Sequence, residues 1–570
     1  MFRLRPHVNL NGIVNISQGI EEVGNKIIEI IVKEKFKYIS LEMYPGVQPT
    51  ALIEYLQALI PEALIVNTDD LFISPKYISQ QIQDDLTTDE VFGRFSHKKF
   101  EDFLDKRKIE EFKKMIMGVD RPVIVYGVCA SEIIKHDILI YLDITRLEIQ
   151  ERFRENYKNW KGYNENDFNE KLKRAYYFEW PAGKEVKDRV LPILDYYIDM
   201  KISNNPKMIT GDDFIEVLGE FISQPFRLVP FFQPGVWGGQ WMKENFNVGK
   251  EEDNLAWCFD GVPEENSIIA KSNQREIEMP AENLLITHPE ELLGRKVYGQ
   301  YGKDFPIRFN YLDTMGGGNL SLQVHPTLDY AYRNFGAKYT QDESYYIMDS
   351  KEGAKVYLGV KDNINKNELI NALEEAQNTG VFDEEKYINI LSVNKHDHLL
   401  IPGGTIHSSG KDCVVLEISS TPNRFTFKLW DWGRLDLDGK PRPISIHHGK
   451  HVIKTEFNTS FVAEELYNNE NVITKENKYT EVQTGLHELE PIETRVLTLS
   501  KPIHQSTMNS VNVLKIVEGE SAQVVSIDGS FNPTDIYYGE TFIIPERIKN
   551  YILKPINGFK EVKIIKAFIR

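Results

Sequence analysis

Three separate stretches of the chain carry side chains of the types that bind metals. GGGNLSLQVHP (316–326) holds Gln323 and His325 two residues apart, and side chains at that spacing on a strand point to the same face. Glu343 follows at the start of another apolar run, and His407 comes after a Pro-Gly-Gly turn. Two imidazoles, a carboxylate and an amide oxygen suit Zn²⁺ or a similar divalent ion. The pattern therefore predicts one metal site inside a β-barrel.

The spacing of these residues matches the cupin pattern. The first cupin motif is a Gly, five residues, HxH and then a Glu; here Gly317 is followed by five residues and QxH, so Gln323 replaces the first His. The second motif is a Gly, five residues and PxGxxH. Residues 402–407 match the PxGxxH part, while His396 stands where the Gly would be.

Several motifs in order resemble the bacterial class I mannose-6-phosphate isomerases: PGVWGG, LSLQVHP, DESYYI, IPGGTIHSSGKDCVVLEIS and TFKLWDWGR. The resemblance covers about 226–570. It implies a zinc-dependent enzyme, with one Zn²⁺ per chain, that interconverts mannose 6-phosphate and fructose 6-phosphate through an enediol. It also implies these zinc ligands: Gln323, His325, Glu343 and His407.

The chain departs from that family at three places. Lys428 stands where the family has a catalytic Arg, Gln341 where a Lys is common, and residues 254–257 where a GExW-like element is common. Lys lacks the planar fork of Arg but keeps its positive charge. Because Lys428 stands at the position of the catalytic Arg, we expect it to be catalytic. Arg434 and Ser321 are expected to bind the sugar phosphate. These changes affect the substrate and the rate rather than the metal site.

Two other functions remain open. A chain that kept the metal site and lost its acid/base groups would be a non-catalytic, metal-containing regulator that binds sugar phosphates, and Lys428 and Gln341 favour this alternative. A cupin oxygenase would need iron with open coordination positions. Outside the motifs, His396 and His398 are expected in a solvated turn. Trp237 is expected in the core or in the pocket wall.

Residues 1–225 alternate between short apolar runs and segments with helical periodicity, which predicts an α/β domain with a mostly parallel sheet. The expected strands lie within 37–44, 63–68, 121–128 and 136–144, and the expected helices within 19–35, 49–59, 99–117 and 145–157.

Parts of this domain vaguely resemble nucleoside kinases, with residues 44–47 in the place of a phosphate loop. No GxxxxGK[ST] occurs in the chain, so the loop would lack its phosphate clamp. We therefore expect a degenerate kinase-like module without phosphotransfer activity. Asp69 and Asp70 are expected in a solvated turn or a helix cap rather than at a cation.

Two further breaks in composition divide the rest of the chain. A Pro-, Gly- and aromatic-rich stretch begins near Pro225, and 456–490 is polar and turn-rich. The predicted fold is multidomain: the α/β domain (1–225), a cupin barrel (226–455) and a second β-barrel or sandwich (456–570). One helical insertion is expected near 362–390, with Asn365 as its N-cap.

The composition of the chain excludes several classes of binding partner. The 570 residues carry a net charge of −18, which argues against nucleic acid or an anionic membrane as a partner. Three cysteines without CxxC spacing argue against disulfides and a thiolate zinc site. The first residues lack a signal peptide pattern, and no run is long enough to span a membrane, so we expect a cytoplasmic protein. The oligomeric state is not predicted.

Overall fold

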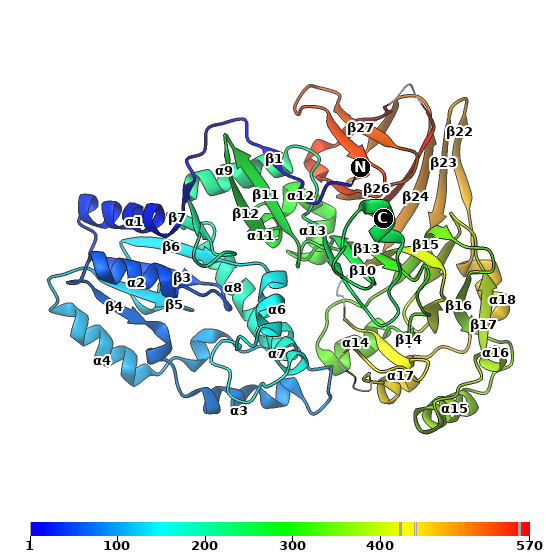
Figure 1. Ribbon diagram of the computed structural model, residues 1–570, viewed down its shortest axis with the longest axis horizontal. Coiled ribbons are helices and arrows are strands. Elements are labelled where there is room, and N and C mark those ends of the chain that lie inside the picture. Colours follow the sequence, from blue (N-terminus) through cyan, green and yellow to red (C-terminus); the bar gives the residue numbers. More distant parts are fainter. Residues whose placement is uncertain (1, 421–423, 438, 440–441, 557–559) are drawn as a thin grey trace. The chain divides into compact units, whose positions relative to one another are not determined.

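The computed structural model describes residues 2–420, 424–437, 439, 442–556 and 560–570 (Figure 1). The chain forms two compact units, and each is assembled from segments that are separate in the sequence. One unit, called the N-terminal unit below, consists of His7–Phe221 and Pro263–His288. The other, called the barrel unit, consists of Met1–Pro6, Ile222–Val262 and Pro289–Arg570.

A seven-stranded sheet forms the centre of the N-terminal unit, in the order β2-β8-β7-β6-β3-β5-β4. The five strands from β3 to β7 run parallel, and β8 is antiparallel to β7, which confirms the mostly parallel sheet. Their bounds are Tyr38–Met43 (β3), Leu64–Asn67 (β4), Val123–Gly127 (β5), Ile138–Asp143 (β6), Tyr196–Asp199 (β7), Lys207–Thr210 (β8) and Ser17–Gln18 (β2).

The predicted helices of this unit are present, with shorter bounds. Each buries the apolar face that its periodicity predicts; α1, for example, buries Val23, Ile27 and Ile31. The last helix of the set begins at a Thr145 cap, whose hydroxyl accepts from the backbone N–H of Glu148. The bounds are Ile20–Glu34 (α1), Thr50–Leu59 (α2), Lys106–Met117 (α4) and Arg146–Arg154 (α6).

Residues 263–288 fold with the N-terminal unit, although they follow Pro225 in sequence. They form β11 (Ser267–Ser272), β12 (Arg275–Pro280) and α11 (Glu282–Thr287), and β11 pairs with β1 (Val8–Asn9). Buried charges join α11 to the sheet. Arg146 lies 2.6 Å from Glu282, and Lys187 lies 2.9 Å from Asp143 and donates to Asn283.

Two antiparallel sheets form the barrel that carries the cupin motifs. The first, in the order β18-β15-β20-β13-β10-β9, has the bounds His398–Ile401, Glu343–Ser350, Cys413–Ser420, Ile307–Asp313, Trp257–Gly261 and Phe231–Gln233. The second, in the order β17-β16-β19-β14-β21, has the bounds Ile388–Ser392, Lys355–Val360, His407–Ser409, Leu322–Val324 and Phe427–Trp430. Their inner faces share a core that includes Trp237, Leu320, Tyr345, Leu358 and Val415.

The helical insertion is α15 (Lys366–Thr379), and Asn365 caps it by accepting from the N–H groups of Asn367 and Glu368. The expectation of a single insertion is wrong, because further helices flank the strands. These helices have only five to eight residues each, so their buried positions cover too few turns to show a helical period in the sequence. They are α10 (Trp241–Phe246), α12 (Pro289–Leu293), α13 (Arg295–Tyr301), α14 (Leu328–Phe335) and α17 (Ile446–Val452).

Two more antiparallel sheets follow, around a separate core. One has the order β22-β23-β24-β31-β26-β29, and the other β25-β30-β27-β28. The bounds are Asn471–Glu476, Tyr479–Gly485, Ile492–Leu499, Val562–Ile569, Asn512–Glu518 and Thr541–Ile544 for the first, and Ile503–Ser506, Asn550–Pro555, Ser521–Ser526 and Thr534–Tyr537 for the second. This is the second β region that the sequence predicts.

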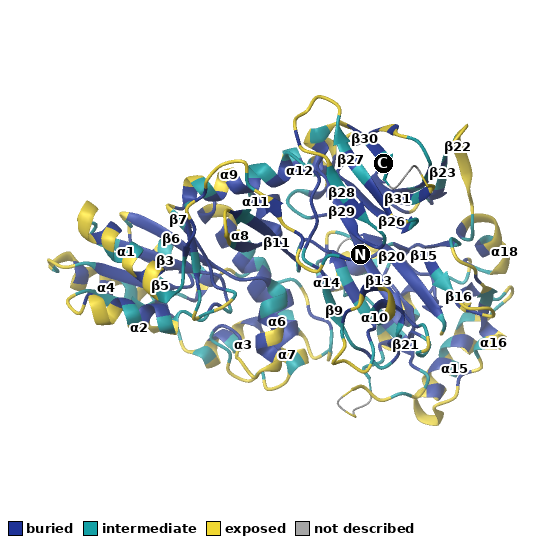
Figure 2. Ribbon diagram, turned by 45° about the horizontal axis from the view of Figure 1, so that its top comes forward, coloured by how far each residue is buried: buried dark blue, intermediate teal, exposed yellow. Residues whose placement is uncertain are grey.

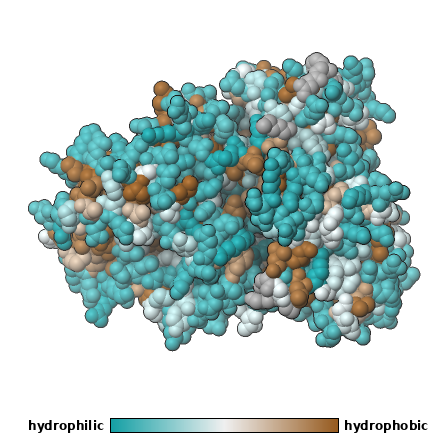
Figure 3. Space-filling view, in the orientation of Figure 1, coloured by the Kyte–Doolittle hydropathy of each residue, from teal (hydrophilic) through white to brown (hydrophobic). Residues whose placement is uncertain are grey.

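Most of the residues on the strands of the sheets are buried. Figure 2 shows the strands mostly in the buried colour, while the outer faces of helices such as α1 and α4 are exposed. The face in Figure 3 is coloured mainly hydrophilic, with hydrophobic residues in separate small groups. Cys129, Cys258 and Cys413 are buried free thiols. Within the described ranges, no helix is long and apolar enough to cross a membrane.

Candidate metal centre

The structure brings the four predicted ligands together inside the first barrel. Gln323 lies on β14 and pairs with His407, the first residue of β19. His325 follows the end of β14, and Glu343 begins β15. The two strands that carry the histidines belong to one sheet and the strand of Glu343 to the other, so the site forms only when both sheets pack together.

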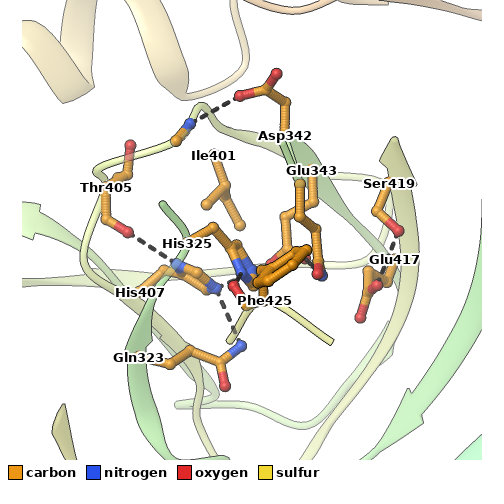
Figure 4. A network of polar contacts seen from close by, with 12 residues as sticks. Gln323, His325, Asp342, Glu343, Ile401, Thr405, His407, Glu417, Ser419 and Phe425 are labelled. Carbon is orange, nitrogen blue, oxygen red and sulfur yellow. Dashed lines mark hydrogen bonds and ion pairs between the residues drawn. The ribbon is translucent and has the colours of Figure 1, made fainter. Parts of the chain in front are cut away.

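Figure 4 shows the side chains converging on one point. Nε2 of His325 lies 3.0 Å from Oε2 of Glu343, and Nε2 of His407 lies 2.9 Å from Oε1. The amide nitrogen, Nε2, of Gln323 lies 3.1 Å from Nε2 of His407. The ligand atoms of the two histidines and the glutamate all lie within 4.8 Å of one another, and all four residues are buried.

The outer ring nitrogens decide which atoms face the centre. Nδ1 of His325 lies 2.9 Å from the backbone oxygen of Phe425, and Nδ1 of His407 lies 2.9 Å from that of Thr405. A carbonyl oxygen only accepts, so both Nδ1 atoms donate, and each ring presents Nε2 to the centre, with a lone pair free for a metal when that nitrogen carries no proton. This arrangement fits a divalent cation held by two imidazoles and a carboxylate.

The charges of the cluster favour a cation as well. Burial alone would raise the pKa of Glu343, but the rings of His325 and His407 outweigh burial and hold that pKa well below its usual range. Burial would likewise lower the pKa of His325, and the Glu343 carboxylate raises it instead. The cluster therefore stabilises positive charge at its centre, which is what a metal ion brings.

A second layer of hydrogen bonds orients the carboxylate. Gln341, which is buried, donates from Nε2 to Oε2 of Glu343 at 3.1 Å. The next residue, Asp342, accepts from the backbone N–H of Gly403 at 2.9 Å, which ties the start of β15 to the turn before His407. These contacts fix Glu343 between the two rings.

Lys428 and Ser321 lie beside Gln323. Lys428 is directly opposite Gln323 in the β14–β21 ladder, so their side chains share a face. Ser321 donates from Oγ to Oε1 of Gln323 at 3.3 Å. Burial lowers the pKa of Lys428 to about 8, and the neighbouring Arg442 adds to this effect. Lys428 thus combines proximity to the ligands with a charge that titrates just above neutral pH.

Arg434 lies at the loop that leads into β14. A Cβ on Gly318 would lie 3.2 Å from Nη1 of Arg434, so the guanidinium lies against that loop. Nη2 forms an ion pair of 2.5 Å with Asp431, and Asp431 also accepts from Arg442 at 2.7 Å. The two arginines therefore share one carboxylate.

Glu417, on β20, also faces the site and is not among the residues predicted from the sequence. Ser419, two residues on, pairs with Glu343 in the ladder, so Glu417 faces the same interior. Its Oε1 accepts from Asn310 at 3.2 Å. The same oxygen accepts from Ser419 at 3.1 Å (Figure 4). Burial raises its pKa, and the charge of Glu343 adds to the rise. The available signal was a lone carboxylate within the apolar run VVLEIS.

The expected solvated turn at residues 396–398 is wrong for His398. His398 is buried, with hydrogen bonds of 2.9 Å to Ser344 and 3.0 Å to Thr484. Burial lowers its pKa to about 3. His396 is half-buried between Tyr346 and Glu518. Trp237 is 1% exposed and belongs to the barrel core, which settles its two expected positions in favour of packing.

Comparisons with known proteins bear on both units. ManA of Bacillus subtilis, named a mannose-6-phosphate isomerase, is 25% identical over 233 residues, which are 41% of this chain and 69% of ManA. YvyI of the same organism is 28% identical over 231 residues, 40% of this chain and 67% of YvyI. The chain is thus homologous to mannose-6-phosphate isomerases over about 40% of its length.

A solved structure agrees at the level of the fold. The mannose 6-phosphate isomerase of Bacillus subtilis aligns with a TM-score of 0.50 and 21% identity, over 60% of this chain and 99% of that one. A family model described as a domain of unknown function, DUF8485, matches residues 19–223. None of these comparisons supports the nucleoside-kinase resemblance that we expected for the N-terminal residues.

Proposed function

We propose that this chain is a zinc-dependent aldose–ketose isomerase that interconverts mannose 6-phosphate and fructose 6-phosphate. One observation carries the proposal. The buried cluster of His325, Glu343 and His407, with Gln323 beside it, lies in a barrel of a chain homologous to mannose-6-phosphate isomerases. The roles of the site residues are part of the same proposal.

The donor set favours zinc over harder or softer ions. Two neutral imidazoles with one carboxylate and one amide match the ligands of Zn²⁺, whereas Mg²⁺ and Ca²⁺ prefer oxygen alone. A bound zinc ion would polarise the sugar carbonyl and hold the neighbouring hydroxyl. Gln323 and His407 would define the side of the ion that faces Lys428, because Lys428 is opposite Gln323 in the ladder.

Proton transfer between the two sugar carbons needs a group that can both accept and donate. Glu417 fits this role because its raised pKa lets the carboxyl carry a proton closer to neutral pH than an exposed glutamate does. Asn310 and Ser419 hold Oε1, which fixes the direction of the carboxyl. We infer that Glu417 moves the proton.

The phosphate requires cations that remain near the sugar. Lys428 is charged below about pH 8. Arg434 carries a permanent charge, and Asp431, its partner, is already shared with Arg442. Asp436 also lies 3.9 Å from Arg442, so two carboxylates balance the two guanidinium groups and Lys428 supplies the excess positive charge at this edge of the barrel, which suits a phosphate dianion. Ser321 lies on the same side and offers a hydroxyl.

A coupled assay of the full chain, loaded with zinc and supplied with mannose 6-phosphate, tests the activity. Turnover is expected, and Glu417→Gln should lower it by about 10²–10⁴-fold while zinc stays bound. Glu352→Gln, an exposed carboxylate at a turn of the same barrel, is the control and should leave the rate unchanged. No turnover by the zinc-loaded chain would refute the enzymatic proposal.

A non-catalytic regulator that binds sugar phosphates is the second candidate. It is favoured by Gln341, which is neutral and directed at Glu343 instead of at a substrate. Saturable binding of mannose 6-phosphate without turnover, and its loss in Lys428→Ala, would support this candidate over the isomerase.

A further inference from the structure

The N-terminal unit contains a cavity of about 480 Å³. It lies outside the carboxyl ends of β3, β4 and β5, between the loop 44–49, the start of α2 and residues 158–161. Chain order reverses at β3, because β4 and β5 lie on one side of it and β6 and β7 on the other. Ligands of open parallel sheets bind at this kind of position, and the volume is within the usual range for small-molecule sites.

The loop 44–49 is poorly suited to a phosphate. Pro45 and Pro49 have no N–H group to donate. Two other N–H groups are already used within the protein, since Tyr44 donates to Leu142 at 3.0 Å and Val47 donates to Tyr44 at 3.2 Å. A loop that holds phosphate presents several free N–H groups in succession. This loop cannot, although it occupies the corresponding place.

Asn159 provides an acceptor that lacks a partner. The residue is 5% exposed and lines the cavity. Its Nδ2 donates to the backbone oxygen of Lys171 and to Oε2 of Glu179, both at 3.0 Å. These bonds turn the amide nitrogen away from the cavity. Its Oδ1 is buried and has no hydrogen-bond partner among the described residues, so it requires a donor from a ligand or water.

The groups that hold Asn159 are themselves held by buried ion pairs. Glu179 ends a π-helical turn, η3 (Ala175–Glu179), and its Oε1 accepts from Nε of Arg174 at 2.9 Å. Arg174 is fully buried and also pairs with Glu165 at 2.7 Å. Single π-helical turns within α-helices occur frequently at functional sites. The relay from Arg174 through Glu179 fixes the direction of Oδ1 before any ligand arrives.

The remaining polar lining is balanced in charge and in donors. The lining contains two carboxylates, of Glu54 and Asp69, and two ammonium groups, of Lys158 and Lys161, so its formal charges cancel; Lys161 already donates one hydrogen bond to the backbone oxygen of Asp69. Asp69 lies in the turn η1 (Thr68–Leu71), and a turn is what the sequence predicts for this residue. Its carboxyl lies beside the indole N–H of Trp160. A lining with equal positive and negative charge offers no net attraction to an anion or a cation, yet it offers both donors and acceptors.

We propose that this cavity binds a small uncharged polyhydroxylated molecule, of the chemical class of a monosaccharide or a sugar alcohol. Hydroxyl groups donate and accept at once, so they satisfy Oδ1 of Asn159 and the Asp69 carboxylate as acceptors and the lysines as donors. The binding is independent of the metal centre and does not rest on the proposed isomerase activity.

Calorimetry on the full chain tests the proposal with D-mannose, D-fructose, D-glucose and D-mannitol as probes. At least one probe should bind saturably, and amide hydrogen exchange should slow in residues 44–54 and 158–161. Asp69→Ala should weaken binding at least tenfold, because one charged hydrogen-bond partner is lost. Asp70→Ala is the matched control; Asp70 is exposed and outside the lining, so binding should change less than twofold.

Thr50→Trp gives a second test that leaves the core intact. Thr50 is exposed at the first position of α2 and lines the cavity, so an indole there should obstruct the ligand without unfolding the unit. The proposal is overturned if none of the four probes binds, or if the slowed exchange appears at 321–325 instead. Tighter binding of ATP or mannose 6-phosphate than of every uncharged probe in this cavity would also overturn it.

Discussion

Each histidine of the candidate metal centre is held by a backbone carbonyl instead of a side chain. Phe425 and Thr405 supply these oxygens to His325 and His407. A backbone acceptor remains in place when neighbouring side chains change, so the inward direction of each Nε2 depends on the barrel backbone. Substitution of a ring therefore removes a ligand without removing the group that orients the other ring.

Replacing His325 or His407 with Ala should abolish stoichiometric zinc binding. Loss of an orienting contact alone costs about 10–100-fold in metal affinity, and loss of a ligand costs more. Elemental analysis after zinc loading and desalting should find about one equivalent in the native chain and little in either variant. His504→Ala, an exposed histidine on β25, should retain the metal. Full zinc content in the double variant His325→Ala/His407→Ala would exclude this site.

Lys428→Ala should lower turnover by about 10²–10³-fold, because one preorganised charge is lost, while zinc stays bound. Burial lowers the pKa of Lys428 to about 8, so its charge disappears as pH rises through 8. The native rate should fall in that range, and Lys428→Arg should remove this fall because Arg stays charged. Rates across pH 6.5–9.5 check both points. Lys351→Ala, an exposed cation, is the control.

An unchanged alkaline fall in Lys428→Arg would assign that titration to another group. A normal rate in Lys428→Ala would place the cationic role elsewhere, and the next residues to replace would be Arg434 and Arg424, whose charge acts on Lys428.

At the scale of elements, one buried imidazole joins two sheets of the barrel unit. His398 begins β18 and bonds to Ser344 on β15, which belongs to the same sheet. Its other nitrogen bonds to Thr484 on β23, in the sheet of the last β region. A neutral ring satisfies both contacts, whereas a charged ring would have two hydroxyl groups as partners and no carboxylate.

The buried neutral state of His398 should make the protein sensitive to mild acid. Its pKa falls from a usual 6.5 to about 3 on folding, so between these values the unfolded chain binds the extra proton and stability is lost as pH falls. From pH 7 to pH 5 the loss is about 2 kcal/mol. His398→Gln keeps a donor and an acceptor and cannot charge. Thermal unfolding at the two pH values should show a smaller fall in Tm for the variant than for the native chain.

Other groups also make the native chain less stable in acid. Their contribution cancels when the native chain is compared with His398→Gln, because both proteins contain the same groups apart from residue 398. Equal falls in Tm would mean that His398 takes up a proton in the folded state.

At the scale of the whole molecule, the two units are interleaved in sequence. Residues 263–288 leave the barrel unit and complete the N-terminal unit, and residues 1–6 do the reverse. Phe2 stacks on Phe246, and Arg3 forms an ion pair of 2.6 Å with Glu540. A division at residue 225, which the change in composition favours, therefore separates groups that pack together in each unit.

The fragment 226–570 should fold poorly by itself. Residues 263–288 would lack the unit against which they pack, so apolar side chains that are buried in the complete chain, such as Ile277, Leu284 and Leu285, would be exposed to water. We expect aggregation and binding of a hydrophobic dye. The matched control replaces 263–288 in the same fragment with a short Gly/Ser linker and should be more soluble. A fragment 226–570 as monodisperse as the full chain would show that the segment folds without the N-terminal unit.

Local patterns predicted much of the fold. The parallel sheet, the helices α1, α2, α4 and α6 and the cap at Asn365 depend on residues close in sequence, whose periods and caps are visible there. The placement of 263–288 and the burial of His398 depend on contacts such as Arg146–Glu282, between residues 136 apart, and His398–Thr484, 86 apart. No local period records such pairings.

The same division holds at the candidate site. The sequence by itself determined which side chains can bind a metal and, through the alternation of strands, that Gln323 and His325 share a face. Only the tertiary structure decided that Glu343 comes between the two rings and that Lys428 and Glu417 lie on the same interior. The reason is physical: the direction of a side chain follows from its own backbone, but convergence requires two sheets to pack in one register.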